Sequence, residues 1–337
     1  MITLPHISSQ IDEKLIFKVI KQNYAHIAPS FYSFISNWLI RAYQRYNQID
    51  KFIIIVYLIH NNLKFYRKNG LIFNFETFYK ERAIEIEKIN ISDISKDLNI
   101  PKESVRRKII ELEKNKIIQK FGKKIFVDKS TFQASKATES VKDLSNVFYE
   151  FNLLLKKENL INNVFDKSQI TESIKKNFTF CLYQFNKFIF IYFSRMRGEF
   201  KDLETFSVGM VVLTNTFSNK NFIPSKIDVK TSVNEIMGTD PKGVNAMSIS
   251  EITNIPRATV VRKLKFLIDN HWLEINEKKL IRLNVKDSAI KKRDEFMEQN
   301  LLSFSNFVYR VFNQMKVINS ANIVDKEENF IPGYMRD

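Results

Sequence analysis

The chain repeats itself, and this repeat restricts its possible architectures more than any other feature of the sequence. Residues 31–52 align without a gap with residues 185–206, 154 positions further on (31 to 185). NIPKESVRRKIIEL at 99–112 aligns with NIPRATVVRKLKFL at 254–267, 155 positions apart (99 to 254). SNVFYEF from Ser145 also matches SNFVYRV from Ser305. Because three separate segments agree at nearly one offset, we infer a duplication that spans most of the chain.

Length and composition fit two folded repeats. A chain of 337 residues is long enough for two domains of roughly 150 residues each. Hydrophobic residues make up 44% and charged residues 27%, which is ordinary for a chain that buries a core. The sequence predicts an N-terminal segment at 1–28, a first repeat at 29–158, a linker at 159–176, a second repeat at 177–316 and a flexible tail at 317–337.

Each copy predicts the same order of elements. Closely spaced apolar residues without strict alternation predict buried helices over 31–46 and 50–66. Residues 143–155 and 291–315 predict long closing helices, one in each repeat. The expected fold class is therefore mainly α: two tandem winged helix-turn-helix domains, each with flanking long helices and a small β-hairpin wing.

The first copy carries a helix-turn-helix pattern over 91–115. Ser92 is expected to cap a short helix through its side-chain oxygen, and Pro101 suits the first position of a second helix. The apolar residues of that second helix recur at helical spacing and predict one buried stripe: Val105, Ile109 and Leu112.

The second copy repeats this pattern over 247–269. Ser250 is the expected cap, and Pro256 opens the second helix. The buried stripe is predicted at the equivalent residues Val260, Leu264 and Leu267. The helix before the turn is expected to be about three residues shorter than in the first copy, because 252–256 is a shorter segment than 94–101.

A hairpin is predicted after each second helix. Segments 117–120 and 124–127 flank the turn Phe121-Gly122-Lys123, and segments 272–275 and 279–283 flank Asn276-Glu277-Lys278. Lysines at both turns place positive charge at the tips of the predicted wings.

The exposed face of each second helix is basic. Residues 101–110 contain four basic residues against the single acid Glu103, and residues 256–265 contain no acid. Arginine and lysine bind phosphates, arginine pairs with guanine edges, and hydroxyl groups donate to either. The candidate DNA-binding residues are Lys102, Ser104, Arg106, Arg107, Lys108, Lys123, Lys124, Arg257, Thr259, Arg262, Lys263, Lys278, Lys279 and Arg282.

These motifs resemble the winged helix of bacterial transcription regulators, and the flanking helices make the MarR-type group the most similar. The resemblance covers about 31–157 and 185–316. It implies that helices 101–115 and 256–269 enter the major groove of double-stranded DNA. It further implies that the wing lysines and Arg282 follow the backbone or minor groove. In the MarR-type group the flanking helices form a dimerisation platform, which implies a possible homodimer through these helices.

The duplication suggests that one chain imitates the twofold dimer of such regulators, with helices of the two halves pairing across an internal pseudo-axis. The two recognition helices differ in sequence. We therefore expect an asymmetric DNA site with half-sites about one helical turn apart, rather than a palindrome.

The overall charge agrees with an anionic partner but carries less weight than its placement. Lys and Arg number 53 against 37 Asp and Glu, a formal net charge of +16. The abundance of Lys, Ile, Asn and Phe is also what an AT-rich genome produces without selection for binding. The argument for DNA therefore depends on the two basic helices.

The sequence predicts a cytoplasmic protein without a membrane segment. Residues 1–14 lack the basic and apolar regions of a secretion signal, and the longest apolar runs are far shorter than the ~20 residues of a membrane span. Cys181 is the only cysteine, and we expect it to be buried and inert.

No constellation predicts catalysis, a metal or a cofactor. The chain lacks a phosphate-binding glycine loop, a nucleophile elbow and a zinc-protease helix. The four histidines are scattered without metal-ligand spacing: His6, His26, His60 and His271. The aromatic residues predict core, and a small-molecule effector site between the flanking helices stays open.

Two alternatives to a transcription regulator stay open as well. Plasmid and phage replication initiators also carry two winged helices in tandem, although without such long flanking helices. Winged helices also serve as docking modules, so the chain could be a protein-interaction scaffold.

Overall fold

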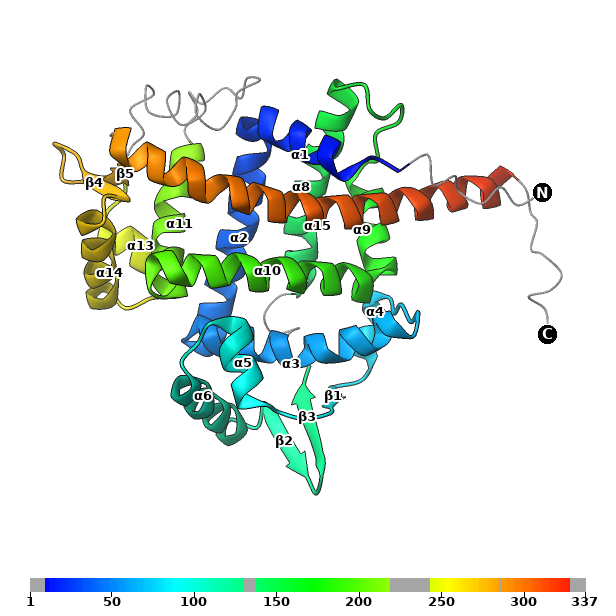
Figure 1. Ribbon diagram of the computed structural model, residues 1–337, viewed down its shortest axis with the longest axis horizontal. Coiled ribbons are helices and arrows are strands. Elements are labelled where there is room, and N and C mark those ends of the chain that lie inside the picture. Colours follow the sequence, from blue (N-terminus) through cyan, green and yellow to red (C-terminus); the bar gives the residue numbers. More distant parts are fainter. Residues whose placement is uncertain (1–9, 130–136, 219–242, 285–286, 328–337) are drawn as a thin grey trace.

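The sequence repeat recurs as a repeat of helices in the computed structural model of the chain (Figure 1). The structure describes residues 10–129, 137–218, 243–284 and 287–327. It is mainly helical with small antiparallel sheets, as predicted. The first-half elements are α1 (Glu13–Gln22), α2 (Tyr24–Tyr46), α3 (Ile49–Lys68), α4 (Phe75–Lys80), β1 (Ala83–Ile86), α5 (Ile91–Leu98), α6 (Lys102–Lys114), β2 (Ile118–Phe121), β3 (Lys124–Asp128) and α8 (Ala137–Lys157).

The second half follows the same order. Its elements are α9 (Lys167–Lys176), α10 (Phe178–Phe200), α11 (Leu203–Phe217), α13 (Ala246–Thr253), α14 (Arg257–Asp269), β4 (Leu273–Ile275), β5 (Ile281–Leu283) and α15 (Asp287–Glu327). Helices α2 and α10 both have 23 residues, and α6 and α14 both have 13. The elements predicted at 31–46, 50–66, 143–155 and 291–315 all lie within observed helices.

The first helix of each repeat lies outside the predicted repeat boundaries. Helices α1 and α9 both have 10 residues and begin after an aspartate cap, Asp12 or Asp166, whose side chain accepts backbone N–H groups. Ile16 and Ile20 of α1 are buried, as are Ile170 and Ile174 of α9. Segments 1–28 and 159–176 are therefore not a separate N-terminal segment and a linker; each holds the opening helix of a repeat.

The two repeats interleave. Helix α2 packs against α8 of its own repeat and α11 of the other, and α10 packs against α15 and α3 in the corresponding way (Figure 1). Helix α1 lies on α15, and α9 lies on α8. These contacts between the repeats recur when the repeats are exchanged, as in a symmetric dimer. The prediction of two domains joined by a linker is therefore wrong, because one continuous core crosses the boundary.

Aromatic side chains form the centre of this core, as predicted. Phe31 of α2 packs against Phe188 of α10, with ring centroids 6.1 Å apart, and Phe34 packs against Phe185 at 5.2 Å. These two contacts are exchange mates, since Phe31 corresponds to Phe185 and Phe34 to Phe188. All four rings are buried, so burial of aromatic area holds the halves together.

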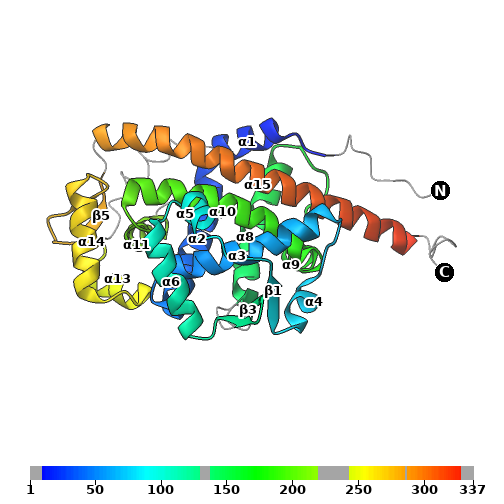
Figure 2. The same ribbon diagram turned by 60° about the horizontal axis from the view of Figure 1, so that its bottom comes forward.

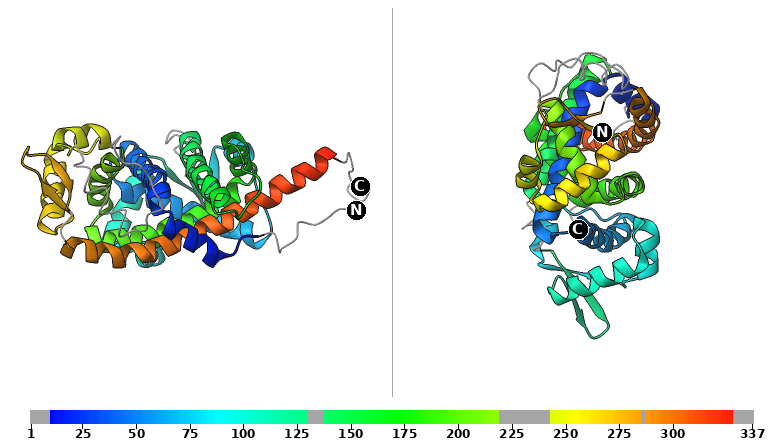
Figure 3. Two further views of the ribbon diagram at one scale, coloured as in Figure 1. Left: turned by 90° about the horizontal axis from the view of Figure 1, so that it is seen from above. Right: turned by 90° about the vertical axis from the view of Figure 1, so that its left-hand side faces the viewer.

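The closing helix of the second repeat is longer than predicted. Helix α15 runs the length of the molecule (Figure 3) and continues to Glu327. The flexible tail predicted at 317–337 is therefore helical over 317–327, and 328–337 lie outside the described residues. Phe304, Phe307, Val308, Val311 and Phe312 bury the inner face of this helix. Over the described residues, no helix combines the length and apolar character that a membrane crossing requires.

Candidate nucleic-acid interface

The first helix-turn-helix unit consists of α5, a three-residue turn and α6. Asn90 caps α5 by accepting hydrogen bonds from the N–H groups of Ser92 and Asp93, at 3.0 and 3.3 Å. Ser92 was predicted as this cap, and that prediction is wrong because the helix begins two residues earlier, at Ile91. Asn99 ends α5 in the left-handed region, with φ of 52°. The Ser95 hydroxyl then donates to the Ile100 carbonyl at 2.7 Å and fixes the turn.

The second unit repeats each of these devices 155 positions later. Asn245 caps α13 by accepting from the Ser248 N–H at 2.9 Å, and Asn254 ends the helix at φ 61°. Ser250, the predicted cap, instead donates its hydroxyl to the Ile255 carbonyl at 2.7 Å. Helices α5 and α13 both have eight residues, so the prediction of a shorter helix in the second copy is also wrong.

A small antiparallel sheet follows each second helix. In the first unit the strand order is β1-β3-β2, and the hairpin of β2 and β3 projects from the body (Figures 1 and 3). In the second unit β4 pairs with β5, and Val244 pairs with Ile281 where β1 pairs in the first unit. The hairpins match the predicted segments. In each unit a residue in the left-handed region leads into the hairpin: Lys116 in the first and His271 in the second.

The buried stripes of α6 and α14 fix which faces are exposed. Val105 and Leu112 are fully buried on α6, and Val260 and Leu267 are buried on α14, as predicted. Helix α6 packs against α3, and α14 packs against α11. The opposite faces therefore point to solvent. In Figure 2, α14 lies at the left end of the molecule and α6 lies on its lower side, beside α5.

Most of the predicted residues of α6 and α14 lie on these exposed faces. Lys102, Arg106 and Arg107 are exposed on α6, and Ser104 is half-buried beside them. Arg106 is 3.8 Å from Glu103, a pair that is weak because both side chains are solvated. On α14 the exposed or half-buried predicted residues are Arg257, Thr259 and Arg262.

Lys108 and Lys263, which were predicted as DNA-binding residues on the exposed faces, are buried instead. Both residues are only 7% exposed. The ammonium group of Lys263 donates to Asp202 at 2.7 Å and to the Thr205 hydroxyl at 3.1 Å. Lys108 lies 3.7 Å from Asp50. These lysines occur at equivalent positions and attach α6 to the first turn of α3 and α14 to the first turn of α11. The sequence did not reveal this, because the carboxylates lie about 60 residues away along the chain.

Arg197 of α10 joins the first unit to the other repeat. Its guanidinium group pairs with Asp50 and donates to the Leu98 carbonyl, the last residue of α5, at 2.9 Å. The side chain is buried. Arg197, Asp50 and Lys108 therefore form one cluster under the helix-turn-helix. Sequence analysis missed Arg197, which no local pattern distinguishes from other basic residues.

The hairpins carry the remaining predicted residues. Lys123, Lys124, Lys278 and Lys279 are exposed. Lys124 pairs with Glu85 at 3.1 Å in a solvated contact. Arg282 is half-buried and pairs with Glu274 at 2.8 Å across the β4-β5 ladder, so this arginine is oriented along the sheet.

The two exposed helix faces differ in chemistry. Arg106 of α6 corresponds to Val261 of α14, and Val261 is 50% exposed. The second unit also exposes Met247 and Ile252 on α13. Lys265, exposed on α14, corresponds to the exposed Ile110 of α6 and extends the basic face beyond the predicted set.

Metal-ligating and thiol side chains of the described residues do not gather beside these faces. Over the described residues, no group of three or more His, Cys, Asp or Glu side chains is placed to hold a metal ion. Cys181 is buried as predicted, and burial raises the pKa of its thiol to about 12. His60 is buried between Tyr183 and Phe190, with ring centroids at 4.9 and 5.2 Å.

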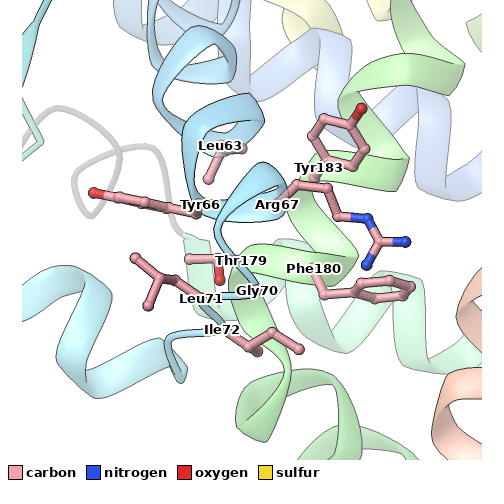
Figure 4. A pocket seen from close by; sticks show the side chains of 9 residues that line it. All are labelled: Leu63, Tyr66, Arg67, Gly70, Leu71, Ile72, Thr179, Phe180 and Tyr183. Atoms are coloured by element: carbon pink, nitrogen blue, oxygen red, sulfur yellow. The ribbon is translucent and has the colours of Figure 1, made fainter.

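A shallow pocket lies at the end of α3 remote from α6 (Figure 4). The guanidinium carbon of Arg67 lies 5.3 Å from the Phe180 ring centroid on one side. Leu71 and Ile72, both exposed, form part of the rim. Because Asp50, and with it the contact to Lys108, lies at the opposite end of α3, this pocket does not belong to the helix-turn-helix surface.

Comparison of the chain with protein-family models, with curated proteins and with solved structures found no match. The argument for function therefore depends on the geometry and chemistry of the two units.

Proposed function

We propose that the chain is a DNA-binding transcription regulator whose two units are winged helix-turn-helix modules, resembling those of MarR-type regulators. Helices α6 and α14 act as the recognition helices, and the β2-β3 and β4-β5 hairpins act as the wings. The two modules bind one DNA duplex as a single-chain pseudo-dimer. The flanking helices, which would form the interface of a two-chain dimer, are already paired within one chain.

One observation carries this proposal: the two units repeat the same cap, turn, buried stripe and buried lysine, and both leave an arginine exposed at the same position. Arg107 and Arg262 are these arginines. No ion pair with another described residue engages either of them. A solvated arginine near the N-terminal half of a recognition helix is available to phosphates and to guanine edges.

The difference between the units supports an asymmetric DNA site. The first unit presents Arg106 where the second presents Val261, an apolar side chain that can contact a thymine methyl group. Two unlike faces that are held by one chain match two unlike half-sites.

The exposed apolar residues of the second unit also favour one alternative. Met247, Ile252 and Val261 are each about half exposed and suit a protein partner as well as a groove. If the second unit is a docking module, only the first unit contributes to DNA affinity.

Affinity for DNA under varied salt tests the proposal. The measurement is fluorescence anisotropy of a labelled duplex, comparing the wild type with Arg107→Ala plus Arg262→Ala. We expect at least tenfold weaker binding and a smaller salt slope, by about 0.9 for each phosphate contact that is lost. The control removes two exposed lysines of the flanking helices, Lys18→Ala plus Lys142→Ala, and should bind as the wild type.

Two results would overturn the proposal: wild-type affinity in the arginine variant, or an equal loss in the lysine control. The single variants decide the alternative. If Arg262→Ala leaves the affinity and its salt slope unchanged while Arg107→Ala weakens binding, the second unit is a docking module.

A further inference from the structure

A second pocket lies inside the helical body, away from the recognition helices. It is partly open to solvent and has a volume of about 90 Å³. Helices α2, α3, α8, α9 and α10 supply nearly all of its wall. Among the described residues, no charged side chain lines it. The residues on which the argument depends are Trp38, Val56, Cys181, Leu182, Phe185 and Asn186.

Asn186 is the unusual member of this wall. The residue is 1% exposed, and neither the oxygen nor the nitrogen of its side-chain amide has a hydrogen-bond partner among the described residues. Buried polar groups in proteins nearly always have partners, because an unpaired amide loses its hydration without compensation. A buried amide that lines a pocket and has no partner therefore indicates a ligand with a hydrogen-bonding group.

The other repeat shows what fills the equivalent space. Asn186 corresponds to Tyr32, 154 positions earlier, and Tyr32 is buried. The Tyr24 hydroxyl donates to the Tyr32 hydroxyl at 2.9 Å, and the Tyr32 ring stacks on Phe217 with centroids 5.8 Å apart. One half of the molecule thus holds a phenol ring where the other half has an asparagine beside a pocket.

Neighbouring exchanges also remove side-chain volume. Cys181 of the pocket corresponds to Ile27, and Val56 corresponds to Met210; both counterparts are buried. Two exchanges go the other way. Leu182 and Trp38 are larger than their counterparts Ala28 and Tyr192, so the pocket is reshaped, but it is not filled.

We propose that this pocket binds a small neutral single-ring molecule with a hydroxyl group, of the size and polarity of phenol. The apolar wall takes the ring, and the Asn186 amide exchanges hydrogen bonds with the hydroxyl. A charged ligand is disfavoured, since none of the described lining residues carries a charge that could compensate for its desolvation. The ligand takes the place that the side chain of Tyr32 occupies in the other repeat.

Fluorine NMR of para-fluorophenol mixed with the full chain tests this site without DNA. The wild type should broaden and shift the probe signal in a saturable way, and unlabelled phenol should reverse the effect. Asn186→Tyr, which restores the residue of the other repeat, should abolish binding. Tyr32→Phe is the matched control in the opposite half and should bind the probe as the wild type.

A second variant keeps the test decisive if Asn186→Tyr fails to fold. Asn186→Leu retains similar volume without the amide. It should weaken para-fluorophenol binding about tenfold, the usual effect of one lost hydrogen bond, and leave fluorobenzene binding within twofold. The proposal is overturned if the wild type binds no para-fluorophenol, if a folded Asn186→Tyr binds it equally, or if Asn186→Leu binds it with wild-type affinity.

Discussion

The carboxylate of Glu204 accepts a hydrogen bond from the backbone N–H of Ile49 at 2.9 Å, so the first turns of α11 and α3 meet. The same two turns hold the buried lysines of α14 and α6, through Asp202 and Asp50. The spacing between the two helix-turn-helix units is therefore set by one junction at the centre of the molecule. In the proposed complex with one duplex, a rigid junction of this kind would reduce the entropy lost when both units bind.

The charge of Glu204 opposes stability at neutral pH. Burial and then the nearby charge of Asp50 raise the pKa of Glu204 above its ordinary value of 4.5. A carboxyl with a raised folded pKa stabilises the fold at low pH and loses this contribution as pH rises from 4.5 through the folded pKa. Glu204→Gln keeps an acceptor for Ile49. In urea unfolding, we expect the Glu204→Gln variant to be more stable than the wild type at pH 8. Near pH 4.5 this advantage should be absent. Equal differences at both pH values would contradict the account.

His60 should make the fold sensitive to acid. Burial, followed by the charges of Lys64 and Lys187, lowers the pKa of His60 to about 3. Between pH 6.5 and 3 the unfolded chain binds a proton that the folded chain does not, so stability falls as pH falls. By pH 5 this loss is about 2 kcal/mol, at about 1.4 kcal/mol per pH unit.

Replacement of His60 by phenylalanine isolates this contribution. The ring keeps the contacts with Tyr183 and Phe190 and cannot be protonated. Between pH 7 and 5 the free energy of unfolding should fall for both proteins. The fall should be about 2 kcal/mol smaller for His60→Phe than for the wild type. The expected pKa would be refuted if both proteins lost the same free energy over this range.

Lys263 should matter more for stability than Lys108. Removal of Lys263 takes away the ion pair that Asp202 makes with it at 2.7 Å. Removal of Lys108 leaves Asp50 in contact with Arg197. We expect Lys263→Met to cost about 1–2 kcal/mol, with the lower value favoured because the Asp202 side chain is 44% exposed. Lys108→Met should cost less. Urea unfolding of the two variants compares them, and a larger cost at Lys108 would refute the assignment.

The asparagine caps should stabilise the helix-turn-helix units, and Ser92, which was predicted as a cap, should contribute little. Asn90→Ala and Asn245→Ala each remove an N-cap and should lower the free energy of unfolding by about 1 kcal/mol. Ser92→Ala should have a much smaller effect, since Ser92 supplies only its backbone N–H to the cap. Thermal unfolding measures all three, and a larger loss at Ser92 than at Asn90 would contradict the observed cap.

The helix-turn-helix segments could be predicted from sequence because their signals are local. Pro101 and Pro256 mark helix starts, and the apolar spacing on each following helix identifies the buried face. The caps were misplaced by a few residues because asparagine is abundant in this chain and Asn90 and Asn245 do not differ from their surroundings. Helix boundaries of this kind depend on which side chain reaches the free N–H groups.

The duplication suggested that helices of the two halves pair, but local signals could not predict which helices do so, nor that the two lysines are buried. Helix α2 contacts α11 of the other repeat, and this pairing depends on complementary surfaces far apart in sequence. Lys108 and Lys263 sit among exposed basic residues on one helix turn, so sequence alone groups them with Arg107 and Arg262. Only the positions of Asp50 and Asp202 separate the buried lysines from the exposed arginines.

Selection from random DNA duplexes, near physiological salt, tests the central claim most directly. It compares the wild type with the single variants Arg107→Ala and Arg262→Ala. We expect the wild type to enrich a site of two unlike half-sites about one helical turn apart, with each variant relaxing the sequence of a different half. A palindromic site, or the same half relaxed by both variants, would contradict a single chain that reads DNA with two different helices.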